Sequence, residues 1–409
     1  MIYNGDRFEV DGDGWMTHEE LLQYFYENYY PREEVMYRLP VSASISEFWP
    51  EALEYRKQNA VVLPLKSWDG HHYWYAPTKK LLQAGDRFVE IARDESIAAM
   101  PQYEHDEGII DEAYYSSVIE GAYSTRQRAR EFIVSGAAPK DRSERMILNN
   151  YEALKFLLEH LDGPINEAVI LEIARILTDG TLDDGVKPGY RDDGVQVVSG
   201  RQEVVYVAPD HQYVKPMMEE LLRYIADPDV HPIIKACVTH IYFVTVHPLF
   251  DGNGRTARAL AYMILLKAGY HFIRQFPISG ILAQERSKYY KAIRAAQSPE
   301  NGYDFTYFLE YYAAMLEQSV EGIHEHMAKF KRVQQLAEQL GNAKEYERIL
   351  KGAHWMVSEN IPTITTEKWR SKFKVSFETA RQDLMKLEEE GFLVKRTVGR
   401  KNFFDLIVG

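Results

Sequence analysis

Residues 247–258 gather the residue types that transfer of a phosphorus group requires. The stretch reads HPLFDGNGRTAR, and its Asp-Gly-Asn-Gly turn is expected to join two helices. Gly252 and Gly254 keep the backbone amides accessible, and free amides at the start of a helix favour an anion. Arg255 and Arg258, three positions apart on the second helix, share a face and add permanent positive charge. The stretch therefore predicts a loop that binds polyphosphate.

Two further side chains extend the prediction from binding to catalysis. Asp251 offers an oxygen ligand beside the phosphates, and Mg²⁺ is commonly held by one or two carboxylates together with substrate oxygens. His247, where the preceding helix ends, can accept a proton from a hydroxyl near neutral pH. Each residue alone is also compatible with a purely structural role, but their joint occurrence at fixed offsets favours attack by a hydroxyl on a metal-bound phosphoryl group.

The elements that must position this loop are mostly helical. Residues 98–330 show a succession of helical patterns joined by short polar segments, which predicts a mainly helical body. One interruption, VQVVSGRQEVVYV at 195–207, has β-branched runs on either side of Ser199-Gly200 and predicts a hairpin. Residues 1–97 are expected to form a helix-rich extension that carries little functional information.

The last part of the chain, residues 341–409, has a different character. It carries 13 Lys or Arg against 10 Asp or Glu, whereas the whole chain has a net charge of -13. Its pattern predicts two helices joined by a turn, with Ser376 as the N-cap of the second helix and Gly391 at its C-terminal end. A hairpin turning at Val398-Gly399 follows, so we expect a winged helix-turn-helix.

Composition restricts the class of protein. The acidic balance argues against a surface that grips nucleic acid or anionic lipid all over. Cys237 is the only cysteine, which excludes an internal disulfide and predicts a cytoplasmic protein with a small buried residue at that position. No secretory signal is expected, and the most apolar run is interrupted by Lys267, so no membrane span is expected either.

HPLFDGNGRTAR closely resembles the signature of Fic-domain proteins, His-Pro-Phe-x-Asp/Glu-Gly-Asn-Gly-Arg-x-x-Arg, with Leu249 in place of the usual Phe. The resemblance covers roughly residues 98–330. It implies a mainly α fold, with a Fic helical-bundle core and the hairpin at 195–207 as the flap, which docks a target protein by adding it as an edge strand. The helix-rich extension and the winged helix-turn-helix complete this architecture.

The resemblance also implies a protein adenylyltransferase that transfers AMP from ATP to a Tyr, Thr or Ser hydroxyl and releases pyrophosphate. His247 would be the base, and Asp251 would hold Mg²⁺ between the α and β phosphates. The other implied contacts to the nucleotide are made by Gly252, Asn253 and Gly254 to phosphate oxygens, by Arg255 and Arg258 to the β and γ phosphates, and by Tyr289 and Tyr290 near the adenine. Helix packing is an equal interpretation of the two tyrosines.

A second motif is similar to the inhibitory helix of Fic proteins. SSVIEG places Ser116, Glu120 and Gly121 at the three defining positions, on a helix expected at about 109–134. A carboxylate that reaches Arg258 forms a charge-assisted pair with the group meant for the γ phosphate, so ATP binds weakly or unproductively. The resemblance therefore implies an autoinhibited enzyme. The same carboxylate could orient water for the reverse reaction, the removal of AMP.

Alternative functions stay open. A winged-helix DNA-binding regulator would use Lys395, Arg396, Arg400 and Lys401 in the wing to touch phosphates, although Glu388, Glu389 and Glu390 suit a DNA surface poorly. Winged helices also dock proteins. Some Fic relatives use another donor and transfer UMP, phosphocholine or phosphate. A homodimer is a further assembly that the sequence leaves open.

Overall fold

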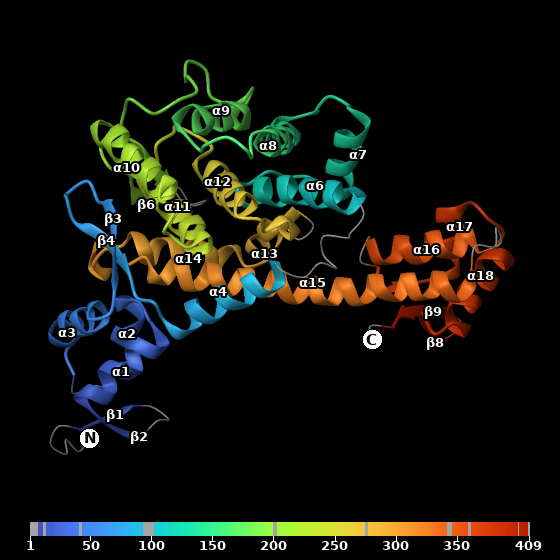
Figure 1. Cartoon of the computed structure of the whole chain (residues 1–409), viewed down its shortest axis with the longest axis horizontal. Helices are drawn as coiled ribbons and strands as arrows, with labels where there is room; N and C mark the ends of the chain where they lie inside the picture. The colour runs from blue at the N-terminus through green and yellow to red at the C-terminus, as the bar shows by residue number, and fades with distance from the viewer. Residues whose placement is uncertain are drawn as a thin grey trace. The chain divides into compact units, whose positions relative to one another are not determined.

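The computed structural model describes residues 7–10, 14–40, 43–92, 102–198, 203–274, 277–341, 346–358, 361–399 and 401–407. The chain divides into two compact units, Met1–Gln318 and Ser319–Gly409. Both are mainly helical with small antiparallel sheets, as the sequence predicts (Figure 1). In the described part of the chain, no helix combines the length and the apolar character needed to cross a membrane.

The N-terminal extension combines helices with two hairpins. Its helices pack around the apolar side chains of Leu21, Phe25, Val35, Phe48 and Trp49. Thr17 and Glu20 form a reciprocal capping box that starts the first helix. The elements are β1 Arg7–Val10, β2 Gly14–Thr17, α1 His18–Asn28, α2 Arg32–Arg38, α3 Ile45–Lys57, β3 Val61–Lys66, β4 His72–Tyr75 and α4 Lys79–Ala92.

Buried polar contacts join this extension to the helices that follow. Arg56, fully buried, donates to the Tyr307 hydroxyl at 2.6 Å and to the carbonyls of Phe25 and Tyr30, both at 2.9 Å. Tyr29 donates to the buried carboxylate of Asp304 at 2.8 Å. A buried guanidinium without these partners would be strongly destabilising. The extension is therefore part of the same compact unit as the predicted bundle.

The bundle surrounds a central pair of helices, α11 and α12. Both are buried over almost their whole circumference, which is why their sequences lack a polar face. Helices α6, α8, α9, α10 and α14 pack around them (Figure 1). The helices of this part are α6 Gln102–Ile119, α7 Arg126–Ser135, α8 Arg142–Glu159, α9 Glu167–Thr178, α10 Val214–Ala226, α11 Pro232–Val246, α12 Asn253–Lys267, α13 Ile278–Gln284, α14 Arg286–Gln297 and α15 Thr306–Leu340, with the 3₁₀ turns η1 His211–Tyr213, η2 His271–Arg274 and η3 Pro299–Asn301.

The single helix expected at 109–134 is in fact two helices. Helix α6 ends at Ile119, and Gly121 has a φ of +93°, a conformation that other residues resist. Thr125 then caps α7 by accepting a hydrogen bond from the Arg128 amide. The expectation was wrong because the break is specified by Gly121 and this cap, which apolar spacing does not reveal.

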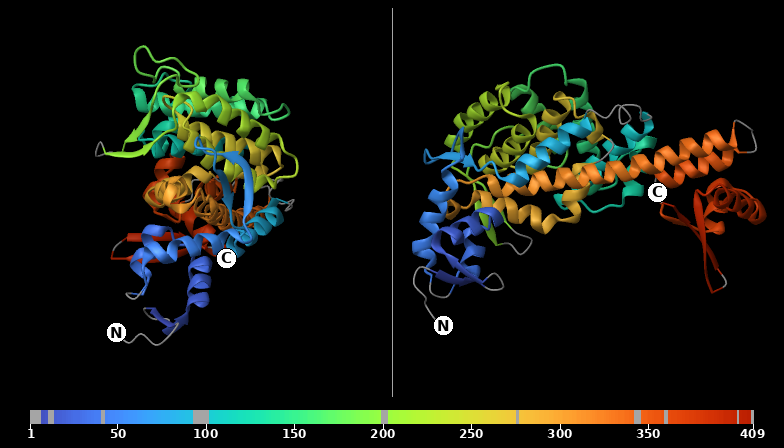
Figure 2. Two further views of the ribbon diagram at one scale, coloured as in Figure 1. Left: turned by 90° about the vertical axis from the view of Figure 1, so that its left-hand side faces the viewer. Right: turned by 60° about the horizontal axis from the view of Figure 1, so that its bottom comes forward.

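The hairpin expected at 195–207 is present as β5 Gln196–Val198 and β6 Val204–Val207, paired from Gln196 with Val207. Its expected turn at Ser199-Gly200 lies outside the described residues. In the left view of Figure 2 these strands project from the helical body. The Tyr206 hydroxyl donates to the Thr245 carbonyl at 2.7 Å, which fastens β6 to the last turn of α11.

The second unit has the order of a winged helix-turn-helix. Ser376 caps α18 through the Thr379 amide, and Gly391 adopts a positive φ just beyond the helix, as expected. Trp369 lies at the centre of its core, against Gly352, where any side chain would overlap the indole ring. After α15 the elements are α16 Glu347–Ser358, β7 Thr363–Ile364, α17 Thr366–Phe373, α18 Phe377–Glu389, β8 Leu393–Val398 and β9 Lys401–Leu406, with strand order β7-β9-β8.

Candidate active site

His247 ends α11 in a left-handed backbone conformation with a φ of +51°. A non-glycine residue adopts this conformation only when its surroundings hold it there. Arg191 supplies that support through its buried guanidinium. It donates to the carbonyl of His247 at 2.8 Å, of Asp193 at 2.9 Å and of Val246 at 3.3 Å, and also to the carbonyl of Pro209. Burial, together with the charge of Arg191, lowers the pKa of His247 to about 4. The imidazole is therefore neutral at pH 7 and able to accept a proton.

The loop after His247 is held by its own asparagine. The Asn253 side chain accepts from the Leu249 amide at 2.9 Å and donates to the Leu249 carbonyl at 2.8 Å. Leu249 itself is buried, so it anchors the loop as a Phe would. Gly252 has a φ of +83° and lies against Thr178, where a Cβ would be 3.1 Å from the Thr178 methyl. These contacts fix the point at which α12 begins.

The start of α12 presents backbone amides to the site. Gly252 is its N-cap, and no side chain of the cap accepts a hydrogen bond from the first turn. Free amides and the helix dipole at this end attract an anion. The Arg255 guanidinium, by contrast, is bound within the protein. Its side chain is 1% exposed and donates to the Leu177 carbonyl at 2.8 Å.

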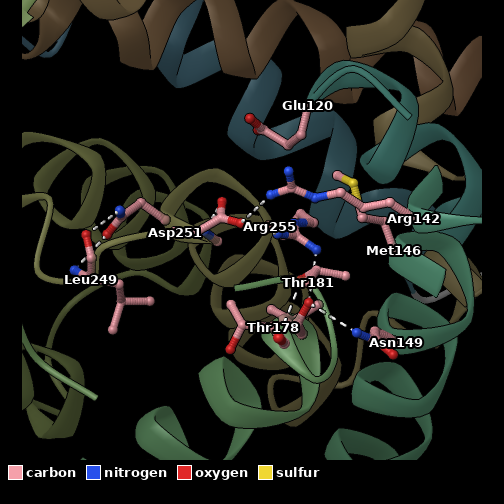
Figure 3. Close-up of polar contacts among 12 residues, drawn as sticks. Glu120, Arg142, Met146, Asn149, Thr178, Thr181, Leu249, Asp251 and Arg255 are labelled. Carbon is pink, nitrogen blue, oxygen red and sulfur yellow. Dashed lines mark hydrogen bonds and ion pairs between the residues drawn. The ribbon is translucent and has the colours of Figure 1, made fainter. Parts of the chain in front are cut away.

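Asp251 lies at the mouth of this loop with its side chain 41% exposed (Figure 3). One of its oxygens accepts from the Gly252 amide at 2.6 Å, and the other lies 3.4 Å from Arg255 and 3.8 Å from Arg142. Within the described residues, no three His, Cys, Asp or Glu side chains gather as a metal cage. A single accessible carboxylate fits Mg²⁺ that takes its remaining ligands from phosphate oxygens and water.

Arg258 contacts α6 and α14, whereas Arg255 contacts α9. It donates to the Ser116 hydroxyl at 2.9 Å and to the Ser116 carbonyl at 2.8 Å. It also forms an ion pair with Glu120 at 2.8 Å, and the exposed fractions of the two side chains are 2% and 28%. The neighbouring carboxylate raises the pKa of Arg258 despite its burial. The two motif arginines thus contact different helices, although the sequence places them on one face.

The Glu120 carboxylate also covers the start of α12. A methyl group added to Gly254 would overlap Glu120 Oε1 and lie 3.2 Å from Arg258 Nη1. The carboxylate therefore lies over the first turn of α12, where an anion would be bound. The contact between Glu120 and Arg258 that the sequence led us to expect is present, and its inhibitory effect stays a prediction.

Comparison with known proteins places this site in a family. Residues 164–265, which span α9 to α12 and the whole loop, match the Fic/DOC family, and residues 359–405 match the DeoR-like helix-turn-helix domain. The chain contains a Fic/DOC domain. This confirms the resemblance drawn from HPLFDGNGRTAR, and the second match agrees with the winged helix expected at the C-terminus.

Similar proteins include the protein adenylyltransferase Fic of Nematostella vectensis, 29% identical over 232 residues, which are 53% of this chain and 48% of that protein. The protein adenylyltransferase fic-1 of Caenorhabditis elegans is 29% identical over 220 residues, 51% of this chain and 40% of that protein. The chain thus spans less than half the length of these relatives. A Fic family protein from Desulfovibrio desulfuricans G20 shares the fold, with a TM-score of 0.55 and 18% identity over 81% of this chain and 97% of that chain.

Tyr289 and Tyr290 do not form an open surface beside the Fic loop. Tyr289 is fully buried, 2.8 Å from His240 Nε2 and 3.4 Å from Arg258 Nη1 through its hydroxyl. Burial raises its pKa to about 12. The Tyr290 hydroxyl donates to the Ile119 carbonyl at 3.2 Å. Tyr289 therefore supports Arg258, which favours the packing interpretation of this residue over contact with adenine.

Sequence reasoning missed two arginines of the Fic site. Arg191 lies in a loop before the flap and Arg142 at the start of α8, both far from the motif in sequence. Neither belongs to a recognisable pattern, because their importance comes from folding that brings them to His247 and Asp251. The phosphate contact expected of Asn253 would have to use its backbone, since both polar atoms of its side chain bind Leu249.

Proposed function

We propose that the chain is a protein adenylyltransferase, which transfers AMP from ATP to a Tyr, Thr or Ser hydroxyl of a target protein and releases pyrophosphate. The observation that carries the proposal is the meeting of three groups in one loop. A neutral imidazole at His247, an accessible carboxylate at Asp251 and the amides that open α12 all lie within residues 247–254.

The chemistry follows from the role of each group. The target hydroxyl gives its proton to the imidazole of His247 as its oxygen bonds to the α phosphorus. The bond from that phosphorus to the bridging oxygen breaks, and pyrophosphate leaves. The amides of α12 and the arginine charge stabilise the phosphate oxygens as negative charge develops on them. Mg²⁺ bound at Asp251 would supply further neutralisation of that charge.

The flap supports a protein as the second substrate. Strand β6 pairs only with β5 among the described strands, and Val204, Val205 and Val207 on it are exposed. An extended segment of a target could pair with the free edge of β6 through main-chain hydrogen bonds. Because Tyr206 fastens β6 next to Thr245, two residues before His247, such a segment would pass close to the base.

We also propose that Glu120 keeps the enzyme at low activity. Its ion pair with Arg258 withholds that guanidinium from phosphate, and its position over Gly254 places like charge where phosphate would bind. Glu120 would thus inhibit in two ways: it competes with phosphate for Arg258, and its negative charge repels phosphate from the start of α12. Activity then depends on displacement of this carboxylate.

The test is label transfer from ATP labelled at the α phosphate. We expect Glu120→Gly to label itself or added proteins more strongly than the unaltered chain, and Glu120→Gly with His247→Ala to transfer nothing. Mass spectrometry of the product distinguishes AMP from UMP, phosphocholine or phosphate and locates the acceptor residue. If the Glu120→Gly variant binds ATP with Mg²⁺ but labels no protein, the proposed transfer is wrong.

A further inference from the structure

Arg255 and Arg258, the two arginines of the motif, are not free to neutralise all of the negative charge of a bound polyphosphate. Arg255 is 1% exposed and bound to the Leu177 carbonyl, and the 2% exposed Arg258 is held by Ser116 and Glu120. Neither guanidinium can extend far toward a ligand without losing buried hydrogen bonds. Arg255 does lie 3.4 Å from Asp251, but it is enclosed, so a nucleotide polyphosphate beside that carboxylate needs a cation that is free to reach it.

Arg142 is placed to supply that charge. It is the first residue of α8, its side chain is 61% exposed, and its Nη2 lies 3.8 Å from Asp251 Oδ2 (Figure 3). That distance is too long for a hydrogen bond, so the guanidinium gives up little when it moves. Beside it lies an open cavity of about 480 Å³, lined by Lys140 and Arg145 and also by Asp141, Asp183 and Asp184. Arg142 therefore has both the freedom and the room to turn.

Helix stability does not explain a cation at this position. Arg142 directly follows the N-cap Asp141, at the end of α8 where the helix dipole disfavours positive charge. Its long contact with Asp251 is mostly exposed, and such contacts contribute little to folding. The placement is better accounted for by a ligand than by the fold.

We propose that Arg142 is a third phosphate-binding arginine of the site, which leaves Asp251 and pairs with the β phosphate of the bound nucleotide. The proposal rests on the proposed function. The assignment to the β phosphate follows from position, because Arg142 lies on the Asp251 side of the loop whereas Arg258 lies on the Glu120 side. The same movement removes one of the two guanidinium groups beside Asp251 Oδ2, the oxygen that does not accept from the Gly252 amide.

The test measures binding of ADP, ATP and AMP with Mg²⁺ by isothermal titration calorimetry, with the full chain carrying Glu120→Gly. Adding Arg142→Ala is expected to weaken ADP and ATP about tenfold or more, the loss of one charged hydrogen bond, and AMP less than about twofold. Arg142→Lys should fall between the two, because lysine keeps the charge without the planar fork.

The matched control is Arg145→Ala in the same background. Arg145 lies one turn further along α8, lines the same cavity and pairs with Asp179 at 4.0 Å instead of Asp251. Its removal should leave all three affinities unchanged. Equal ADP affinity in the Arg142→Ala and Arg145→Ala proteins would overturn the role of Arg142 while leaving adenylyl transfer intact. Absence of ADP and ATP binding in the Glu120→Gly protein itself would overturn both proposals.

Discussion

Replacing Glu120 with alanine is expected to tighten ATP binding strongly. In the resting structure ATP must displace the carboxylate from Arg258, to which it is joined at 2.8 Å with only 28% of its side chain exposed. A hydrogen bond between charged groups contributes about 1.5–3 kcal/mol, so removing this competitor should tighten ATP about 10- to 100-fold. The overlap of Glu120 with a Cβ at Gly254 adds steric and electrostatic hindrance, which makes the lower figure a minimum.

Arg258 should stay in place after this change. It keeps its hydrogen bonds to the Ser116 hydroxyl and carbonyl and to Tyr289. Its charge would nevertheless lose its ionic partner, and a buried charge without one destabilises a protein. The variant without nucleotide should therefore melt at a lower temperature than the unaltered chain, and ATP should raise its melting temperature by more.

The assay is isothermal titration calorimetry with ATP and Mg²⁺, accompanied by thermal melts. Glu120→Gln keeps the size and a hydrogen-bonding oxygen without the charge, so its ATP affinity should lie between those of the unaltered and alanine proteins. Glu131→Ala is the control, because Glu131 pairs with Arg128 on the surface of α7. If Glu120→Ala binds ATP no more tightly than Glu131→Ala, the carboxylate does not compete with the nucleotide.

Three further predictions follow from the same geometry. Because the pKa of His247 is about 4, the transfer rate of the Glu120→Gly variant should be flat from about pH 6 to 8, and an inflection near 6.5 in a pH-rate profile would contradict the assigned base. Arg191→Lys should lower the transfer rate roughly 5- to 150-fold, because an unsatisfied buried carbonyl costs about 1–3 kcal/mol, with little change in the dissociation constant for ATP. An unaltered rate would show that His247 holds its conformation unaided. In the winged helix, Arg381, Lys386 and Arg396 already pair with carboxylates. Among its described lysines, Lys368, Lys372, Lys374, Lys395 and Lys401 stay available for phosphate contacts. Duplex DNA binding should then weaken with salt at a log-log slope no steeper than about 5, measured by fluorescence anisotropy, and a steeper slope would mean that these ion pairs open on DNA.

The two ends of the catalytic loop could be predicted because the residues that end one helix and begin the next lie within the loop itself. Gly252 and the residues around His247 interrupt two apolar helices, and these breaks determine where α11 ends and α12 begins whatever packs around them. Ser376 and Gly391 mark the ends of α18 for the same reason. Helix ends that depend on only a few neighbouring residues can therefore be predicted without knowing what packs against them.

The surroundings of the loop could not be predicted, because they are assembled from distant segments. The four carbonyls bound by Arg191 come from three separate stretches of chain, and no spacing in the sequence relates them. Arg56 is a second example, because nothing near it in the sequence indicates that it is buried. In the structure it contacts Tyr307 and the carbonyls of Phe25 and Tyr30. We expected the N-terminal extension to carry little functional information, and that expectation did not include these buried hydrogen bonds to the rest of the unit. The Arg400 expected in the wing lies outside the described residues.

The anchoring of α6 suggests how inhibition is relieved without loss of the fold. Glu112, two turns before Glu120, is buried and accepts hydrogen bonds from the amide and hydroxyl of Ser279 on α13, which fixes the middle of the helix. Glu120 itself lies beyond the last helical residue, in the turn that contains Gly121 and the exposed Tyr123. We expect displacement of this turn to break the ion pair with Arg258 while the contact between Glu112 and Ser279 remains. Because the middle of α6 keeps its anchor, such an opening should need less free energy than withdrawal of the whole helix.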